Sequence, residues 1–351
     1  MINFGTQSFT TIELGTQLVS AVYWGTQSVY PTTQEVFIYI GHQNQNSGSA
    51  GNTITKMNQS GVIQWQRVSP YLGGFGSSTN ALATKDNKIY TSQNTGNPSN
   101  AGTSSVYDAN GLVLGTYSRN NRGSNAVDVD SLGNIIFGGQ RFTATPGQEN
   151  SLIKLSTTFS VLWRYDHTSN VSSVSVDGSN NVYFGGFVNT GSVSIRKLNS
   201  SGVSQWSANH GATVNKVVAD TSGNLYIAGL TGTSGFTMRK YNTSGTLQWS
   251  RGVNTHGQLR GLAFDSSGNI WAAGATARGN ATWSVVEYDT NGNALGYYDY
   301  GSVFDIQIDT SDNVYIANNN IIRKYTSSGV LSWTYSVPNN RSINAIALAT
   351  Y

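Results

Sequence analysis

Apolar and polar positions alternate over short stretches along most of the chain, and these stretches recur at a regular interval. The clearest are NAVDVDSLGNIIFGG, VSSVSVDGSNNVYFGG, VNKVVADTSGNLYIAG, LRGLAFDSSGNIWAAG and VFDIQIDTSDNVYIAN. In each, an apolar strand leads into a turn with an Asp, an Asn follows four residues later, and a second apolar strand begins. The Asp positions are Asp130, Asp177, Asp220, Asp265 and Asp309. Period-two alternation on both sides of a polar turn predicts paired β-strands.

The second half of each unit contains two more strands. A strand with a basic residue, a turn with a glycine and a strand ending in Trp follow one another, as in SIRKLNSSGVSQW and TMRKYNTSGTLQW. The Trp positions are Trp65, Trp163, Trp206, Trp249 and Trp333. Gly115 and Gly296 stand where two further units would carry Trp. Four short strands in about 45 residues are typical of a β-propeller blade.

The number of blades follows from how the two ends of the chain fit together. Six units carry the first strand and its turn, counting NALATKDNKIYTSQ as a degenerate copy. The earliest unit, from about 34 to 65, lacks a first strand, and the chain ends in SINAIALATY, which resembles a lone first strand. Joining them removes an open sheet edge. The sequence predicts an all-β fold, a seven-bladed propeller over 32–351 whose C-terminal strand closes the first blade.

Two repeated features allow a chemical and a structural interpretation. The Asp-x-x-Gly-Asn turn could hold calcium, but an EF-hand loop needs more oxygen ligands than four residues supply. Asp and Asn bond to their own backbone and tolerate left-handed conformations, which favours the turn interpretation. The Trp residues are interpreted as packing between blades.

The repeated unit resembles the bacterial β-propeller repeat family often named SBBP. The resemblance covers most of 80–335 and rests on the DxSGNhYhAG and KYxSSGxLxW patterns, in which h is apolar. It implies a scaffold and no particular chemistry.

A different repeat precedes the propeller. Gly-Thr-Gln occurs at residues 5, 15 and 25, and the apolar positions around it predict a small β-meander with strands near 8–14 and 18–24. About thirty residues in such strands cannot bury a core of their own. The segment resembles short N-terminal repeats of tailed-phage structural proteins, which implies attachment to a capsid or tail. Residues 1–31 are therefore predicted to be an attachment module that contacts other virion proteins through Phe4, Gly5, Leu14, Gly15, Tyr23, Trp24 and Gly25.

Composition narrows the class of partner. Only 11% of the residues are charged, the net charge is +3, and there is no cysteine. The chain has no Lys/Arg run longer than two residues, so no nucleic-acid partner is expected. It has no apolar run long enough to span a membrane, so no membrane span is expected. A surface of this kind without a secretion signal fits a virion protein made in a host cytoplasm. A homo-oligomer in the particle is left open.

Long connections are expected on one face of the propeller, where strands two and three and consecutive blades are joined. Residues on loops held by a rigid scaffold often bind partners. The candidate binding face consists of His42, Asn44, Tyr71, Phe75, Arg119, Asn120, Arg122 and Arg141. These amides and rings suit host-surface glycan or a polar protein surface, and plain solvated loops are the alternative interpretation.

No motif of a catalytic, cofactor or metal site is present. His167, His210 and His256 occupy similar blade entries, and they are interpreted as exposed loop residues rather than as a joint site. The leading hypothesis is a non-enzymatic bacteriophage virion protein. A lectin-like propeller is the alternative, and an enzyme whose groups come from different blades is the third.

Overall fold

The computed structural model describes residues 13–14, 17–18, 23–24, 27–28, 35–42, 54–67, 77–95, 102–119, 123–140, 151–167, 169–187, 193–231, 235–253, 258–274, 284–338 and 341–350. Within these ranges, no helix has the length and apolar character needed to cross a bilayer.

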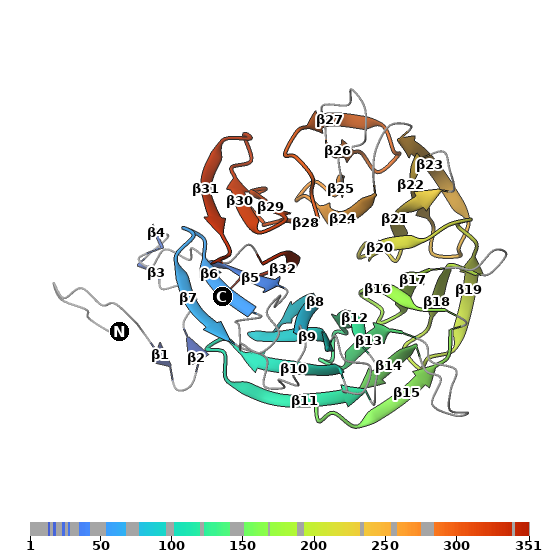
Figure 1. The fold of residues 1–351 in the computed structure, drawn as a ribbon, viewed down its shortest axis with the longest axis horizontal. Coiled ribbons are helices and arrows are strands. Elements are labelled where there is room, and N and C mark those ends of the chain that lie inside the picture. The colour runs from blue at the N-terminus through green and yellow to red at the C-terminus, as the bar shows by residue number, and fades with distance from the viewer. Residues whose placement is uncertain are drawn as a thin grey trace.

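Seven four-stranded antiparallel sheets stand around a central axis (Figure 1). We number them as blades 1 to 7 along the chain. Blade 1 contains β32 (Ile343–Thr350), β5 (Val36–His42), β6 (Ile54–Asn58) and β7 (Ile63–Arg67). Blade 2 contains β8 (Ser77–Lys85), β9 (Lys88–Thr95), β10 (Gly102–Asp108) and β11 (Val113–Arg119). Blade 3 contains β12 (Ser124–Val129), β13 (Ile135–Gly139), β14 (Leu152–Leu155) and β15 (Val161–Tyr165).

The other four blades repeat this order from the axis outward. Blade 4 contains β16 (Val171–Val176), β17 (Val182–Gly186), β18 (Ile195–Leu198) and β19 (Ser204–Ala208). Blade 5 contains β20 (Val214–Ala219), β21 (Leu225–Thr231), β22 (Gly235–Tyr241) and β23 (Leu247–Val253). Blade 6 contains β24 (Leu259–Phe264), β25 (Ile270–Gly274), β26 (Val285–Tyr288) and β27 (Ala294–Tyr298). Blade 7 contains β28 (Asp305–Ile308), β29 (Val314–Asn318), β30 (Ile321–Tyr325) and β31 (Leu331–Ser336).

The ring closes as the sequence predicts. The last strand, β32, pairs antiparallel with β5 from Thr350 opposite Val36 to Ile343 opposite His42. The predicted seven-bladed fold, with the C-terminal strand inside the first blade, is therefore confirmed. The closing strand is the innermost strand of blade 1, so both ends of the propeller chain are bound within one sheet.

The apolar core lies between the blades rather than inside any one of them. One buried cluster, for example, joins Tyr183 and Ile195 of blade 4 to Val217 and Ile227 of blade 5. Each blade is a single sheet and depends on its neighbours for burial, which is the general property of repeat architectures.

The turn between the first two strands of each unit is held by its own side chains. In all five Asp-to-Asn turns, one carboxylate oxygen of the Asp accepts the backbone N–H of the Asn four residues later, and the carboxylate also accepts the Asn amide. In the first turn these distances from Asp130 to Asn134 are 2.8 and 2.9 Å. The repeated Asp and Asn therefore hold the turn together, which confirms the turn interpretation.

The repeated Lys and Trp hold each blade to the next. In blade 4, the Lys197 ammonium and the Trp206 indole N–H both donate to the Thr243 carbonyl of blade 5, at 3.3 and 3.0 Å. The indole also covers Gly245, whose φ is +82°, and a Cβ there would lie 2.6 Å from the ring. The same Lys–Trp clamp joins Lys56 and Trp65 to Ala109, Lys154 and Trp163 to Ser200, Lys240 and Trp249 to Thr290, and Lys324 and Trp333 to Gln59.

Both interfaces that lack the Trp are filled in another way. In blade 2, Gly115 stands where other blades have Trp. In blade 3, Phe159 stands where other blades have the glycine that the indole covers, and its ring occupies the space above Gly115. Between blades 6 and 7, Tyr298 of the same strand covers Gly296, and its hydroxyl donates to Glu287 at 2.9 Å. Glu287 stands where the other blades have the clamp lysine. The predicted role of Trp as interblade packing is thus confirmed, and the two exceptions have local substitutes.

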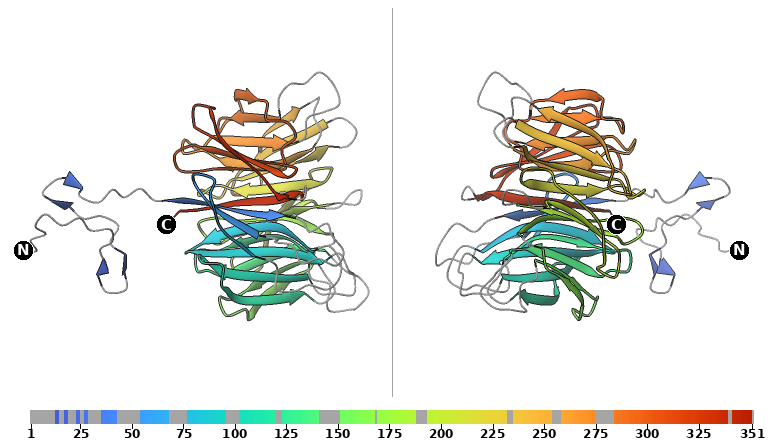
Figure 2. Two further views of the ribbon diagram at one scale, coloured as in Figure 1. Left: turned by 60° about the vertical axis from the view of Figure 1, so that its left-hand side comes forward. Right: turned by 90° about the vertical axis from the view of Figure 1, so that its right-hand side faces the viewer.

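The two faces of the ring differ in their connections. We call the face with the turns between strands one and two, and between strands three and four, the turn face. The opposite side, where strands two and three and consecutive blades are joined, is the loop face. β5 starts at the turn face and β32 ends there, so Val36 and Thr350 lie side by side at that face. Figure 2 shows the short strands β1 to β4 on the same side of the ring.

Two short hairpins lie before the propeller. β1 (Glu13–Leu14) pairs with β2 (Gln17–Leu18), and β3 (Tyr23–Trp24) pairs with β4 (Gln27–Ser28). The reversals fall at the second and third Gly-Thr-Gln sites, as the sequence predicts. The two hairpins form separate sheets, and they stand outside the ring in Figure 2. The division into 1–31 and 32–351 stays a prediction.

Candidate binding site on the propeller axis

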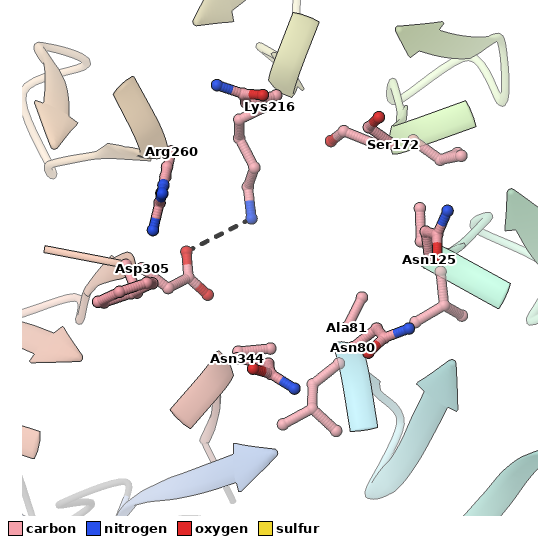
Figure 3. A pocket seen from close by; sticks show the side chains of 16 residues that line it. Asn80, Ala81, Asn125, Ser172, Lys216, Arg260, Asp305 and Asn344 are labelled. Carbon is pink, nitrogen blue, oxygen red and sulfur yellow. Dashed lines mark hydrogen bonds and ion pairs between the residues drawn. The ribbon is translucent and has the colours of Figure 1, made fainter. Parts of the chain in front are cut away.

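A pocket of about 140 Å³ opens at the axis, where the seven innermost strands converge. Each innermost strand contributes one residue to a ring around the pocket. In five blades this residue lies five positions before the turn Asp, and in blades 1 and 2 it occupies the equivalent strand position. This axial ring consists of Asn80, Asn125, Ser172, Asn215, Arg260, Phe304 and Asn344. Figure 3 shows side chains from all sides of the channel meeting at this level. Because first strands run from the loop face toward the turn face, the axial ring lies in the half of the channel nearer the loop face.

Four members of the axial ring bond each blade to the next. The side-chain amide nitrogen of Asn215 donates to the Leu259 carbonyl of the following blade at 2.9 Å. Asn80, Asn344 and Asn125 make the equivalent bond at 3.0, 3.2 and 3.5 Å. Each bond uses only one hydrogen of the amide group. The amide orientation is therefore fixed, while the oxygen and a second N–H keep hydrogen-bonding capacity.

Deeper in the channel, side chains cap the free edges of the inner strands. Asp128 accepts the backbone N–H of Val176 in the next blade at 2.8 Å, and Ser175 accepts that of Ala219 at 2.9 Å. These bonds satisfy edge groups that would otherwise face the channel. Burial raises the pKa of the Asp128 carboxyl from 3.8 to about 6, and its two backbone hydrogen bonds act in the opposite direction.

The charged groups of the pocket lie together on blades 5, 6 and 7. Lys216 reaches across the channel to Asp305, with 3.5 Å between Nζ and Oδ1, and Figure 3 shows Arg260 directed at the same place. The Arg260 guanidinium lies over the Phe304 ring, 4.6 Å from its centroid. Asp305 already accepts the backbone N–H groups of Ile306 and Ile346.

The charges that line the pocket suit an anionic ligand. Two cationic side chains and one carboxylate line it, and that carboxylate is occupied by two amides. The other polar lining groups are amides, hydroxyls and backbone groups, and the rest of the lining is apolar. Within the described ranges, no three His, Asp or Glu side chains come together as a metal-ligand group.

The structure places few of the candidate residues on the predicted binding face. Arg119 ends β11 at the loop face. His42 is the last residue of β5 and only 1% exposed. This corrects the expectation that it belongs to an exposed loop. The other six lie outside the described residues, namely Asn44, Tyr71, Phe75, Asn120, Arg122 and Arg141. Of the predicted attachment residues, the backbone of Leu14, Tyr23 and Trp24 is described, whereas Phe4, Gly5, Gly15 and Gly25 lie outside the described ranges.

The interpretation of the entry histidines as exposed is wrong for His167 and His210, which are each 2% exposed. The cause is a serine at the start of the third strand of the same blade. Ser151 Oγ accepts the His167 backbone N–H at 2.8 Å, and Ser194 does the same for His210, which draws the entry segment inward. Burial, and secondarily the charge of Arg239, lowers the pKa of His210 to about 4. His256 lies outside the described residues.

Sequence reasoning missed the axial ring, although a signal for it exists. Alignment of the units on the turn Asp brings the seven ring positions into one column, which is rich in Asn. The next column holds small residues in five units but Lys216 and Asp305 in the other two. Two charges in an otherwise small column near the axis mark the site.

Comparisons with known proteins identify the fold and leave the activity open. No family model matches the sequence, and no curated protein gives a significant match. Among solved structures, a streptogramin B lyase has a TM-score of 0.58 at 15% identity, covering 78% of this chain and 93% of its own. The WD40 propeller domain of Doa1 has a TM-score of 0.57 at 16% identity, covering 76% and 84%. A protein of unknown function from Bacteroides caccae has a TM-score of 0.50 at 14% identity, covering 90% and 99%.

These likenesses show the β-propeller fold, and the seven blades are those of the structure itself. One of the similar structures is a lyase and another is a WD40 domain. A shared propeller at such low identity carries no information about chemistry, because sites are built on folds independently of them.

Proposed function

We propose that this chain is a non-enzymatic structural protein of a bacteriophage virion, attached through residues 1–31 and presenting the propeller. The observation that carries the proposal is that the two faces of the ring differ. The described propeller chain begins at the turn face with β5, whereas the connections between strands two and three, and the axial ring, belong to the half nearer the loop face. Attachment on one side leaves the other side free for a protein or a host-surface glycan.

A belt of exposed apolar side chains gives further support. Strand four of most blades begins with apolar residues that face solvent just after the turn at the turn face. Their exposed fractions are 56% for Val62, 65% for Leu112, 58% for Val203 and 62% for Val330. Apolar surface of this kind marks contact sites when it is grouped. These residues border the turn face, where β5 begins, so a neighbouring virion protein bound there would cover them.

The two sequence resemblances belong to the same proposal. SBBP-type repeats supply a rigid scaffold, and the short N-terminal repeat is of the kind found in tailed-phage structural proteins. Localisation in the particle, absence of catalysis and contact with other virion proteins are parts of this hypothesis. The lectin-like alternative is favoured by one feature, the polar axial pocket.

The experiment that tests attachment compares two full-length variants in particle assembly. Tyr23→Ser combined with Trp24→Ser alters the third Gly-Thr-Gln hairpin, and Phe187→Ser removes an aromatic side chain that is 51% exposed after β17, at the loop face. We expect the hairpin variant to dissociate from purified particles and the Phe187 variant to stay bound, with equal melting temperatures. Electron cryomicroscopy of the particles then shows which face touches a neighbour. Contacts made only by the loop face would contradict the proposal.

A further inference from the structure

On the charged side of the axial pocket the repeat changes without a packing substitute. At the two interfaces that lack Trp, another aromatic ring covers the glycine that replaces it. Lys216 and Arg260 replace small or amide residues of the repeat, and no neighbouring blade changes to compensate for their charge except Asp305. Where local rules are broken without a structural gain, function is the usual reason.

The Lys216–Asp305 pair differs from a structural ion pair in the same protein. Lys154 and Asp130 lie 2.8 Å apart, with side chains 4% and 0% exposed. Lys216 and Asp305 lie 3.5 Å apart, and the Lys216 side chain is 28% exposed. Charge-assisted hydrogen bonds are normally about 2.7–2.9 Å long. Lys216 is therefore partly hydrated and loosely held, and its ammonium keeps donors for a ligand.

Arg260 is positioned in a similar way. Its Nε and one terminal nitrogen donate to the Gln258 side chain at 3.3 and 3.2 Å, and the Phe304 ring lies beneath the guanidinium. These contacts orient the group and leave two outward N–H groups for a ligand, one on the other terminal nitrogen and one on the terminal nitrogen that already bonds to Gln258. Such a pair can meet the two oxygens of a carboxylate with two parallel hydrogen bonds.

The opposite wall is neutral and polar. Asn125, Ser172 and Asn344 come from blades 3, 4 and 1, and they lie across the pocket from the two cations (Figure 3). The two asparagine amides are held in place by their interblade bonds, so their remaining polar groups have fixed directions. Fixed amides and a hydroxyl recognise hydroxyl groups, which both donate and accept.

We propose that the axial pocket binds one sugar-acid unit, with its carboxylate on Lys216 and Arg260 and its hydroxyls on the neutral wall. The volume of about 140 Å³ is close to that of a cavity that holds benzene, so the pocket encloses the edge of the sugar ring that carries the carboxylate, and the rest of the unit extends into the channel. The pocket lies in the half of the channel nearer the loop face, so the unit can be the end of a longer glycan that reaches it from that side. Binding at the axis depends on neither residues 1–31 nor the turn face, so this inference goes beyond the proposed attachment role.

The test is calorimetric titration of the full chain with glucuronate, glucose and acetate. Glucuronate and glucose differ by the carboxylate, and acetate supplies a carboxylate without hydroxyls. We expect glucuronate to bind at least tenfold more tightly than either. Equal binding of glucose would overturn the role of the cations, and equal binding of acetate would overturn the role of the neutral wall.

Matched variants locate the site. Arg260→Gln should weaken glucuronate binding by about 10- to 100-fold, as expected for loss of a hydrogen bond to a charged group. Arg164→Gln makes the same chemical change at an exposed position of β15 and should leave binding unchanged. Lys216→Gln should weaken glucuronate binding as well, and it tests the site independently if Arg260→Gln does not fold. Glucuronate binding that survives both pocket substitutions would place the ligand elsewhere and refute the proposal.

Discussion

The exchange of aromatic rings between blades 2 and 3 makes a sharp prediction about stability. At the regular interfaces a Trp of one blade covers a glycine of the next. Here Gly115 replaces the Trp and Phe159 replaces the glycine, so the ring reaches the same space from the other side. The double variant Gly115→Trp/Phe159→Gly restores the regular arrangement, and the two single variants each break it.

The structure sets the magnitudes. A Cβ on Gly115 would lie 2.1 Å from the Phe159 ring, so Gly115→Trp alone should cost about 3 kcal/mol, at the upper end for overpacking. Phe159→Gly alone removes a half-buried ring, worth about 1–2 kcal/mol. It also relieves a φ of +63°, which costs about 1 kcal/mol in a residue with a side chain. The net loss for this variant should therefore stay below about 1 kcal/mol.

Urea unfolding of the wild type and the three variants forms a double-mutant cycle. We expect the double variant to be more stable than Gly115→Trp by about 2 kcal/mol or more, a coupling typical of residues in direct contact. As a control, Gly245→Phe at a regular interface places two aromatic rings in one space and should destabilise. Additive effects of the two exchanges, within about 0.5 kcal/mol, would refute the reasoning.

Three further predictions concern the clamp and two buried titrating groups. Trp206→Phe keeps a ring but loses the hydrogen bond to the Thr243 carbonyl, and it should lower the free energy of unfolding by about 1 kcal/mol. The control Leu247→Ala changes a side chain that is 47% exposed, and it should lower the free energy of unfolding by less than about 0.5 kcal/mol. Asp128 has a raised pKa in the folded protein, so its contribution to stability falls as pH rises from about 4 to 6, by at most ~1.4 kcal/mol per pH unit. His210 has a lowered pKa, so its contribution is lost as pH falls from 6.5 to about 4. Between about pH 4 and 6 these two contributions change the free energy of unfolding in opposite directions. Asp128→Asn removes the falling contribution, so chemical denaturation should show stability rising more steeply with pH, whereas His210→Leu removes the rising contribution and should make stability fall with pH. Slopes equal to that of the wild type would contradict the assignments.

The blade count and the ring closure could be predicted because repeated residues have one spatial task each. Asp130 and Asn134 fix a turn with their own side chains, so their spacing carries the information without knowledge of neighbours. Lys197 and Trp206 lie side by side on paired strands and share one carbonyl of the next blade. Such pairs recur whenever the task recurs, and they are visible in a single sequence.

The burial of the histidines could not be predicted in the same way. The position of His210 depends on a hydrogen bond from its backbone to Ser194, sixteen residues earlier. A serine is common in this chain and carries no sign of that bond. A loop assignment based on polar residue types therefore places His210 at the surface, whereas the backbone bond draws it into the interior.

The changes in the repeat are of two kinds, and only one kind points to function. Phe159 and Tyr298 look like defects in the sequence, yet the ring of each covers the glycine that stands in place of Trp, so packing gives each a reason. Lys216 and Arg260 look less conspicuous in the sequence, yet they add positive charge at positions where most units have small or amide residues. A search for sites in a propeller should therefore first remove the changes that have a partner across the interface. In this chain, that step leaves the two axial cations as the residues for which a ligand, rather than a neighbouring blade, supplies the reason.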